Sequence, residues 1–183
     1  MSEPITVAEA AEHLRIDTDS PFLESTYLAT LITVARQYCE NYLQRTIGDQ
    51  VRCISLPAFP YGTTPMTLPN PPVYSVDDIT YVAQDGSNQK VTGVILSDGR
   101  IQPAYGSVWP IARAQIGSVT ITYTAGYISG GSPNDFPLAI KQAMLLVIGD
   151  LYQNREGQFV GVSATVNPTV MNLLTPYRVS MGI

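Results

Sequence analysis

The sequence predicts an α+β fold, in which a bundle of about three to four helices has a β-rich insertion between them. Apolar residues recur at helical spacings of three and four near both ends, most clearly in residues 21–44 and 137–156. Between these, residues 50–126 hold β-branched and aromatic runs cut by proline, Asp-Gly and glycine signals. We therefore expect one composite domain with an N-terminal helical part (1–49), the insertion (50–126) and a C-terminal part (127–183).

The first predicted helix is short. Thr6 followed by Glu9 forms a capping box, which predicts a helix that ends near Leu14. His13 is the only histidine of the chain, so any histidine-based metal site or Cys-His nucleophile pair would have to use it. We interpret it as a partly exposed helix residue.

The second predicted helix is long and amphipathic. Ser20 as N-cap and Pro21 at the first helical position open it, residues 21–44 form it, and Gly48 is the expected stop. Its apolar stripe consists of Leu28, Leu31, Ile32, Ala35, Tyr38, Cys39, Tyr42 and Leu43. The opposite, polar face consists of Thr30, Thr33, Arg36, Gln37, Glu40 and Asn41.

Four runs of the insertion are typical of strands, namely residues 51–56, 73–82, 90–99 and 118–127. Alternation in the last run predicts one apolar face, formed by Val119, Ile121 and Tyr123. The pairs Asp85-Gly86 and Asp98-Gly99 predict hairpin turns.

No group of residues in the sequence predicts catalysis. Asp77 and Asp78 are neighbouring carboxylates, but neighbours on a regular strand point to opposite faces and cannot share a site. Cys39, on the apolar stripe, and Cys53, in a strand, are both expected in the core. The glycine-rich stretches lack the lysine and the spacing of a phosphate loop. We therefore expect no enzyme, no catalytic or cofactor-binding residues, no cofactor and no metal site.

The helix predicted over residues 137–156, with Gly157 as its C-cap, is apolar on every side. Six consecutive apolar residues run from Ala143 to Ile148, whereas a surface helix needs only one apolar stripe. Two interpretations stay open at this point: a central core helix, or a helix packed on its own fold on one side and on a neighbouring subunit on the other.

The C-terminal residues predict a short helix that Pro168 opens and Pro176 ends. Several apolar residues surround its end, namely Leu173, Leu174, Tyr177 and Val179. Because a frayed tail rarely carries such residues together, we expect this segment to dock onto another surface.

Composition favours an assembly subunit. Charged residues make up 14% of the chain and hydrophobic ones 45%, so its surface suits burial against partners better than exposure to water. The net charge is −5, and the ten Lys and Arg residues form no cluster, which argues against tight DNA binding. Without a signal peptide, a membrane-spanning run or a disulfide framework, we expect a cytosolic protein of a reducing compartment.

Four stretches in order carry a family resemblance. The N-terminal part reads ITVAEAAEHLRIDTDSPFLESTYLATLITVARQYCENYLQRTI, and it is followed by VTITYTAGY, PLAIKQAMLLVIGDLYQNRE and LLTPYRV. Together they resemble the longer members of the phage head–tail connector (adaptor) proteins, which open with a short helix, an acidic turn and a long helix. The resemblance spans nearly the whole chain and is weakest over residues 57–113.

This resemblance implies a ring, expected to be a dodecamer, that lies under the portal in the virion neck, extends the DNA channel and joins head to tail. The implied partners are other copies of the chain, the portal protein and a stopper or tail-completion protein. Double-stranded DNA would pass through without specific binding, which suits an acidic chain. No membrane partner is expected, and assembly would take place in the cytoplasm of the bacterial host.

The ring implies two sets of contact residues. The subunit interface is expected at Leu145, Ile148, Tyr152 and Arg155 on the apolar helix. Portal docking is expected at Leu173, Leu174, Tyr177 and Arg178. The alternative is another virion structural role, as a tail terminator or completion protein or as a capsid decoration protein.

Overall fold

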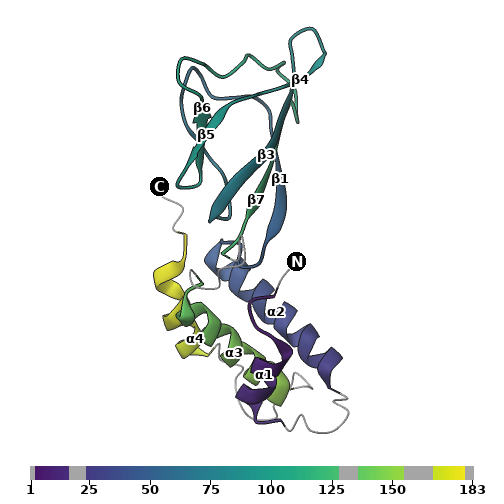
Figure 1. Cartoon of the computed structure of the whole chain (residues 1–183), viewed down its shortest axis with the longest axis vertical. Coiled ribbons are helices and arrows are strands. Elements are labelled where there is room, and N and C mark those ends of the chain that lie inside the picture. Colours follow the sequence, from purple (N-terminus) through teal and green to yellow (C-terminus); the bar gives the residue numbers. More distant parts are fainter. Residues whose placement is uncertain (1–2, 17–23, 128–135, 155–166, 180–183) are drawn as a thin grey trace. The chain divides into compact units, whose positions relative to one another are not determined.

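The computed structural model describes residues 3–16, 24–127, 136–154 and 167–179. The chain forms two compact units, which are described separately: a helical unit (Met1–Gly48 with Gly130–Ile183) and a β unit (Asp49–Ser129). Within the described residues there are four α-helices and two antiparallel sheets, which confirms the predicted α+β class (Figure 1).

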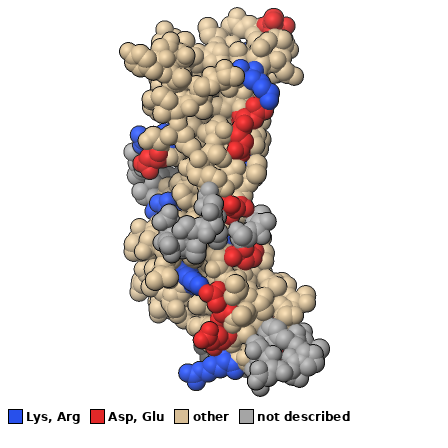
Figure 2. Space-filling model, in the orientation of Figure 1, with Lys and Arg blue, Asp and Glu red and all other residues tan. Residues whose placement is uncertain are grey.

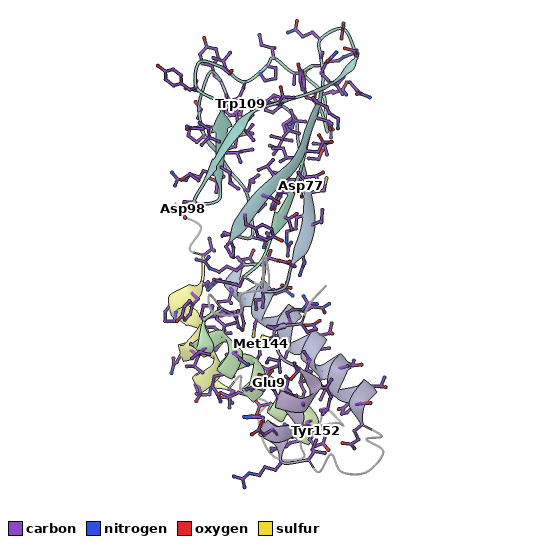
Figure 3. All side chains as sticks on the ribbon, in the orientation of Figure 1. Glu9, Asp77, Asp98, Trp109, Met144 and Tyr152 are labelled. Carbon is purple, nitrogen blue, oxygen red and sulfur yellow. The ribbon has the colours of Figure 1, made fainter. Side chains whose placement is uncertain are left out.

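The helical unit is built around one central helix. Its elements are α1 (Val7–Leu14), α2 (Ser25–Leu43), α3 (Leu138–Gln153), α4 (Pro168–Leu174) and a 3₁₀ turn (Thr175–Tyr177). Helix α3 packs against α1, α2 and α4. Fully buried residues of α2 and α3 form the core between them, including Leu28, Ile32, Ile140, Met144 and Ile148. Met144 is labelled among these helices in Figure 3.

Both ends of α1 and the C-terminal end of α2 agree with prediction, whereas the start of α2 does not. The capping box of Thr6 and Glu9 is present, and α1 ends at Leu14. Helix α2 begins at Ser25, four residues after the predicted start, and the predicted N-cap lies outside the described residues. It ends before Gly48, because Gln44 adopts the left-handed conformation (φ 54°) and the following backbone amides bond to Glu40.

The β unit contains two sheets. The first has the order β1 (Gln50–Leu56), β7 (Val119–Ala125), β3 (Val73–Val82) and β4 (Asn88–Lys90). The second has the order β2 (Met66–Thr67), β6 (Arg100–Pro103) and β5 (Val94–Ser97). The predicted run 90–99 is divided between β4 and β5, because Gly93 interrupts it with a positive φ of 77°.

The predicted apolar face of β7 is confirmed. Alternate residues Val119, Ile121 and Tyr123 are fully buried, and they belong to a core that also contains Leu68, Ile79, Ile101, Trp109 and Ala125. The Asp98-Gly99 pair is confirmed as a two-residue hairpin turn between β5 and β6, with φ values of 49° and 70°. The Asp85-Gly86 pair turns the chain between β3 and β4.

Two expectations about the first sheet are wrong. A β-bulge shifts the register of β3 between Val76 and Asp78, so Asp77 and Asp78 lie on the same face. Directly paired residues share a face: Asp78 lies opposite Thr122, and Asp77 accepts a hydrogen bond from Thr124 on that side (2.6 Å). Cys53 also pairs with Thr122 and is exposed, because its position in β1 faces outward.

Candidate assembly surfaces

The apolar helix α3 is largely covered by its own unit. Ile148 has no exposed surface, so its side chain packs in the core of its own unit. Leu145 is half-buried on the same helix. Leu138, at the first turn of α3, is 79% exposed and is the most exposed large apolar residue of the described helical unit. The consecutive apolar residues are therefore explained mainly by packing against α1, α2 and α4.

The C-terminal end of α3 is fixed by a tyrosine. The Tyr152 hydroxyl donates a hydrogen bond to the Glu24 carboxylate (2.6 Å), and its ring lies 6.2 Å from that of Tyr27 at the start of α2. Arg155, the last of the four predicted interface residues, lies outside the described residues, and the helix ends at Gln153.

The C-terminal segment is folded along α2 of the same unit. Leu174 is fully buried and Leu173 half-buried, whereas Arg178 is exposed. The predicted short helix is confirmed: α4 begins at Pro168 and ends at Leu174, and a 3₁₀ turn then continues the segment to Tyr177. The segment therefore combines residues that fix it to the helical unit with residues that remain open to solvent.

Side-chain and backbone contacts hold this segment in place. The Tyr42 hydroxyl bonds to the Thr175 hydroxyl (3.0 Å), and the Arg178 guanidinium lies 5.1 Å from the centre of the Tyr42 ring. Arg45 Nε donates to the Tyr177 carbonyl (2.6 Å), and the Val179 amide donates to the Leu43 carbonyl (2.9 Å). These contacts fix Tyr177 and Arg178 close to the end of α2.

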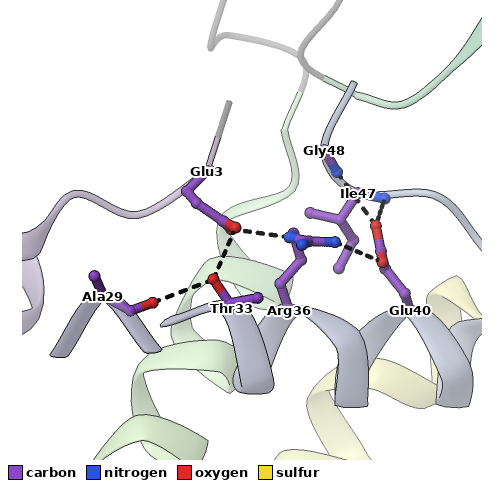
Figure 4. Close-up of polar contacts among 7 residues, drawn as sticks. All are labelled: Glu3, Ala29, Thr33, Arg36, Glu40, Ile47 and Gly48. Carbon is purple, nitrogen blue, oxygen red and sulfur yellow. Dashed lines mark hydrogen bonds and ion pairs between the residues drawn. The ribbon is translucent and has the colours of Figure 1, made fainter. Parts of the chain in front are cut away.

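A buried ion-pair network, which the sequence did not predict, stabilises the helical unit (Figure 4). Arg36 is 4% exposed and donates to Glu3 through Nε (2.9 Å) and to Glu40 through Nη1 (2.8 Å). The other oxygen of Glu40 accepts from the Ile47 amide (2.8 Å). The prediction that Arg36 and Glu40 belong to the exposed polar face is wrong, because the N-terminal residues and the turn after α2 cover them. Their spacing of four residues was the available signal.

The described residues show few charged side chains on the face drawn in Figure 2 and no cluster of metal-ligating side chains. Figure 2 shows a face that is mostly uncharged, with acidic and basic side chains scattered over it. No three His, Cys, Asp or Glu side chains come together as a metal site in the part of the chain that the structure describes. No described helix is long and apolar enough to cross a membrane. His13 is exposed on α1, as interpreted from the sequence.

Two titratable groups of the helical unit depart from their usual behaviour. A hydrogen bond from Lys141 and one from the Thr6 backbone lower the pKa of Glu9. Burial raises the pKa of the Cys39 thiol to about 12, so this thiol stays protonated and inert. Both shifts reflect packing of the helices, because Glu9 pairs with Lys141 and Cys39 is buried.

The class of protein follows from its likeness to a known family. The sequence matches the head completion protein family over residues 3–179. The chain belongs to this family. Head completion proteins are structural proteins of the virion and are not enzymes, and the match confirms the resemblance to head–tail connector proteins predicted from the sequence. A search among curated proteins found no relative.

Solved structures share the fold along the whole chain. One is the neck of an empty gene transfer agent (GTA) particle computed with C6 symmetry: TM-score 0.77, 24% identity, 100% of this chain and 95% of that chain covered. A second is the virion of a native GTA particle, with TM-score 0.75, 25% identity and coverage of 98% and 92%. A third is the neck of a native GTA particle computed with C12 symmetry, with TM-score 0.72, 25% identity and coverage of 97% and 90%.

Proposed function

We propose that this head completion protein forms a twelve-membered ring in the virion neck, under the portal, where it extends the DNA channel and joins head to tail. The observation that carries the proposal is the likeness to the neck computed with C12 symmetry, which covers 97% of this chain and 90% of the other at 25% identity. The proposed partners are neighbouring copies, the portal and a stopper or tail-completion protein. Subunits would be made and assembled in the host cytoplasm.

The charge of the chain supports a channel role. Each copy carries a net charge of −5, so a ring of about twelve copies would carry on the order of −60 before ions neutralise part of it. Such a ring repels phosphates and lets double-stranded DNA slide past without specific binding. We expect no membrane in this arrangement.

The exposed side of the C-terminal segment is the proposed portal contact. Leu173, Tyr177 and Arg178 keep exposed or half-buried surface, while Leu174 is buried and would act by fixing α4 to the helical unit. On α3, Leu145 and Tyr152 keep partial exposure and remain the proposed contacts with a neighbouring copy, and Arg155 stays a proposal from the sequence alone.

The proposed docking role is tested with a truncation and a matched pair of substitutions. Removal of the residues after Thr175 should leave a folded subunit that no longer joins portal-bearing heads. Leu173→Ser should weaken attachment, whereas Asn172→Ala, at an exposed position of the same helix, should not. Normal attachment of the truncated protein would remove the docking role.

The ring itself is tested by native mass spectrometry of the purified protein, with and without purified portal, and by negative-stain images of the same samples. We expect closed rings of twelve copies, formed alone or on the portal. Immunogold labelling of particles separates this function from the alternative, because a tail terminator or a capsid decoration protein would be labelled on the tail or the shell. A protein that stays monomeric with portal present and labels outside the neck contradicts the proposal.

A further inference from the structure

Two loops of the β unit expose large apolar side chains that its core does not use. They are the loop between β1 and β2 (57–65) and the loop between β6 and β7 (104–118), called here the apolar loops. Five of their side chains are 65% or more exposed, namely Tyr61, Tyr105, Val108, Ile111 and Ile116. Surfaces of this kind on a folded protein mark sites of interaction.

The apolar loops are fixed in place through Trp109, which is labelled in Figure 3. Its backbone amide donates to the Gly62 carbonyl (2.9 Å), and its indole Nε1 donates to the Thr64 carbonyl (2.9 Å). Its ring, 4% exposed, stacks on Phe59 with centroids 5.0 Å apart. The buried indole therefore joins the two loops, and the exposed residues Tyr61 and Val108 are the chain neighbours of the two residues, Gly62 and Trp109, that the backbone hydrogen bond connects.

The second half of the longer loop is fixed to the first sheet. Ala112 forms a bridge with Ala83, and the Arg113 amide donates to the Val82 carbonyl (2.8 Å). Ile111 precedes this attachment directly, so its exposed side chain is also presented by a fixed backbone. Because little ordering entropy remains to be lost, the apolar loops can bind a partner at low conformational cost.

Their composition is that of an interface and not of an ordinary surface. Arg113 is the one charged residue in the two loops. The other residues are aromatic or aliphatic (Tyr, Trp, Phe, Ile and Val), small (Ala, Gly, Ser and Thr), Pro or Gln. Aromatic enrichment with depletion of Lys and Glu is the signature of the centre of protein–protein contacts. The partner chemistry is therefore an uncharged, largely apolar protein surface.

Charge distribution favours another copy of this chain as that partner. Residues 49–129 hold five acidic and four basic residues, whereas the rest of the chain holds ten acidic and six basic ones. Two copies of an acidic protein repel each other least where the β unit, nearly neutral, meets its neighbour. In a ring each copy must contact the next. The inference therefore rests on the proposed function, which supplies the ring.

The exposed apolar area is large enough to form the centre of such a contact. The five side chains together present on the order of 800 Å² to water, comparable with the roughly 800 Å² that each partner contributes to a standard interface. We propose that the apolar loops, centred on Tyr61, Val108 and Ile111, bind the neighbouring copy of this chain.

The first test compares two variants of the full-length protein. One carries Tyr61→Ser, Val108→Ser and Ile111→Ser, and the control carries Val51→Thr and Ile95→Thr, exposed apolar positions on strands of the same unit. Both should keep the wild-type circular dichroism and melting temperature, because all changed side chains are exposed. Self-association is measured by sedimentation velocity over a concentration series, with and without portal.

We expect the loop variant to raise the dissociation constant between copies by roughly a hundredfold, and the control to leave it within about threefold of wild type. Rings that form equally well from the loop variant would overturn the inference and leave the proposed function intact. If the copies associate through the loops but the protein is absent from the neck, the proposed function is overturned and the inference stands. Wild-type protein that never associates, even on portal, overturns both.

The second test locates the contact. In a Cys53→Ser background, which removes the exposed native thiol, Val108→Cys is labelled with a benzophenone maleimide. The labelled protein is photo-cross-linked as a mixture of unlabelled and ¹⁵N-labelled copies. The masses of the cross-linked peptides then distinguish links within one chain from links between two chains. Mixed-isotope cross-links support the inference, whereas links confined to one chain, or only to portal in assembled particles, contradict it.

Discussion

Arg36→Met should remove a large part of the stability of the helical unit. Arg36 is buried between Glu3 and Glu40, with N–O distances of 2.9 and 2.8 Å, and the side chain of Glu40 is only 9% exposed. Removal of one partner from a buried ion pair costs about 3–5 kcal/mol. We expect the lower end, about 3 kcal/mol, because Glu3 is 29% exposed and can be hydrated, and Glu40 keeps its bond from the Ile47 amide.

Glu40→Gln should lower the free energy of unfolding by less, about 1–2 kcal/mol, because the amide oxygen of Gln can still accept a hydrogen bond from the Ile47 backbone amide. In the double variant the loss should be smaller than the sum of the single losses by at least about 1 kcal/mol, since the two residues act on the same contact. The matched control is Lys90→Met. Lys90 pairs with Asp78 on the surface, where the side chains are 67% and 41% exposed, so this change should cost less than about 0.5 kcal/mol.

The assay is urea unfolding followed with two probes. The helical far-UV circular dichroism signal reports mainly on the helical unit, whereas fluorescence of Trp109, the single tryptophan, reports on the β unit. We expect Arg36→Met to lower the midpoint of the first signal. An Arg36→Met protein that unfolds within about 0.5 kcal/mol of wild type would refute the reasoning, because the network would then contribute no net stability.

Three further predictions concern single groups. Native protein should give one thiol equivalent with a disulfide reagent at pH 8 and two after unfolding, because Cys53 is exposed while Cys39 is buried with a raised pKa; two equivalents in the native state would contradict this. Lys141→Met should lower stability at pH 7 by less than about 1 kcal/mol, since Glu9 is 41% exposed. The pKa of Glu9 is lowered in the folded state, so the stability that ionised Glu9 contributes is present above the unfolded-state pKa of about 4.3 and is lost as pH falls through the folded-state pKa. A stability difference between Lys141→Met and wild type that persists in strong acid would show that it does not come from the Glu9 carboxylate. Ile148→Asp should unfold the helical unit and not merely block assembly, because Ile148 has no exposed surface; a variant that keeps the wild-type helical circular dichroism signal would show that the site tolerates a charge.

Elements with local signals were predicted well from the sequence. The capping box at Thr6 and the Asp98-Gly99 turn depend on residues that are neighbours in the chain, and both are present in the structure. The buried face of β7 follows from alternation alone. The bulge at Asp77 was not predictable, because it is defined only by the register of β3 against β7.

The candidate surfaces were less predictable for a physical reason. Consecutive apolar residues point in every direction around a helix, so their pattern does not indicate which side is buried. It could not predict that Ile148 is fully buried while Leu145 keeps some exposure. Arg36 was assigned to the surface because charge normally indicates exposure, and only the fold brings Glu3 to it. Tyr61 and Ile116 present the reverse case: apolar residues in loops that the core does not enclose.

The division of the helical unit by the β unit has a consequence for synthesis. Helix α2 leaves the ribosome long before α3, and its buried residues Leu28 and Ile32 pack against a helix that is still roughly 100 residues away. At about 5–20 residues per second this delay lasts roughly 5–20 s. The β unit, continuous in sequence, can complete its strand pairing in that interval. During that interval the N-terminal helices α1 and α2 therefore lack the helix that covers their apolar faces in the folded unit.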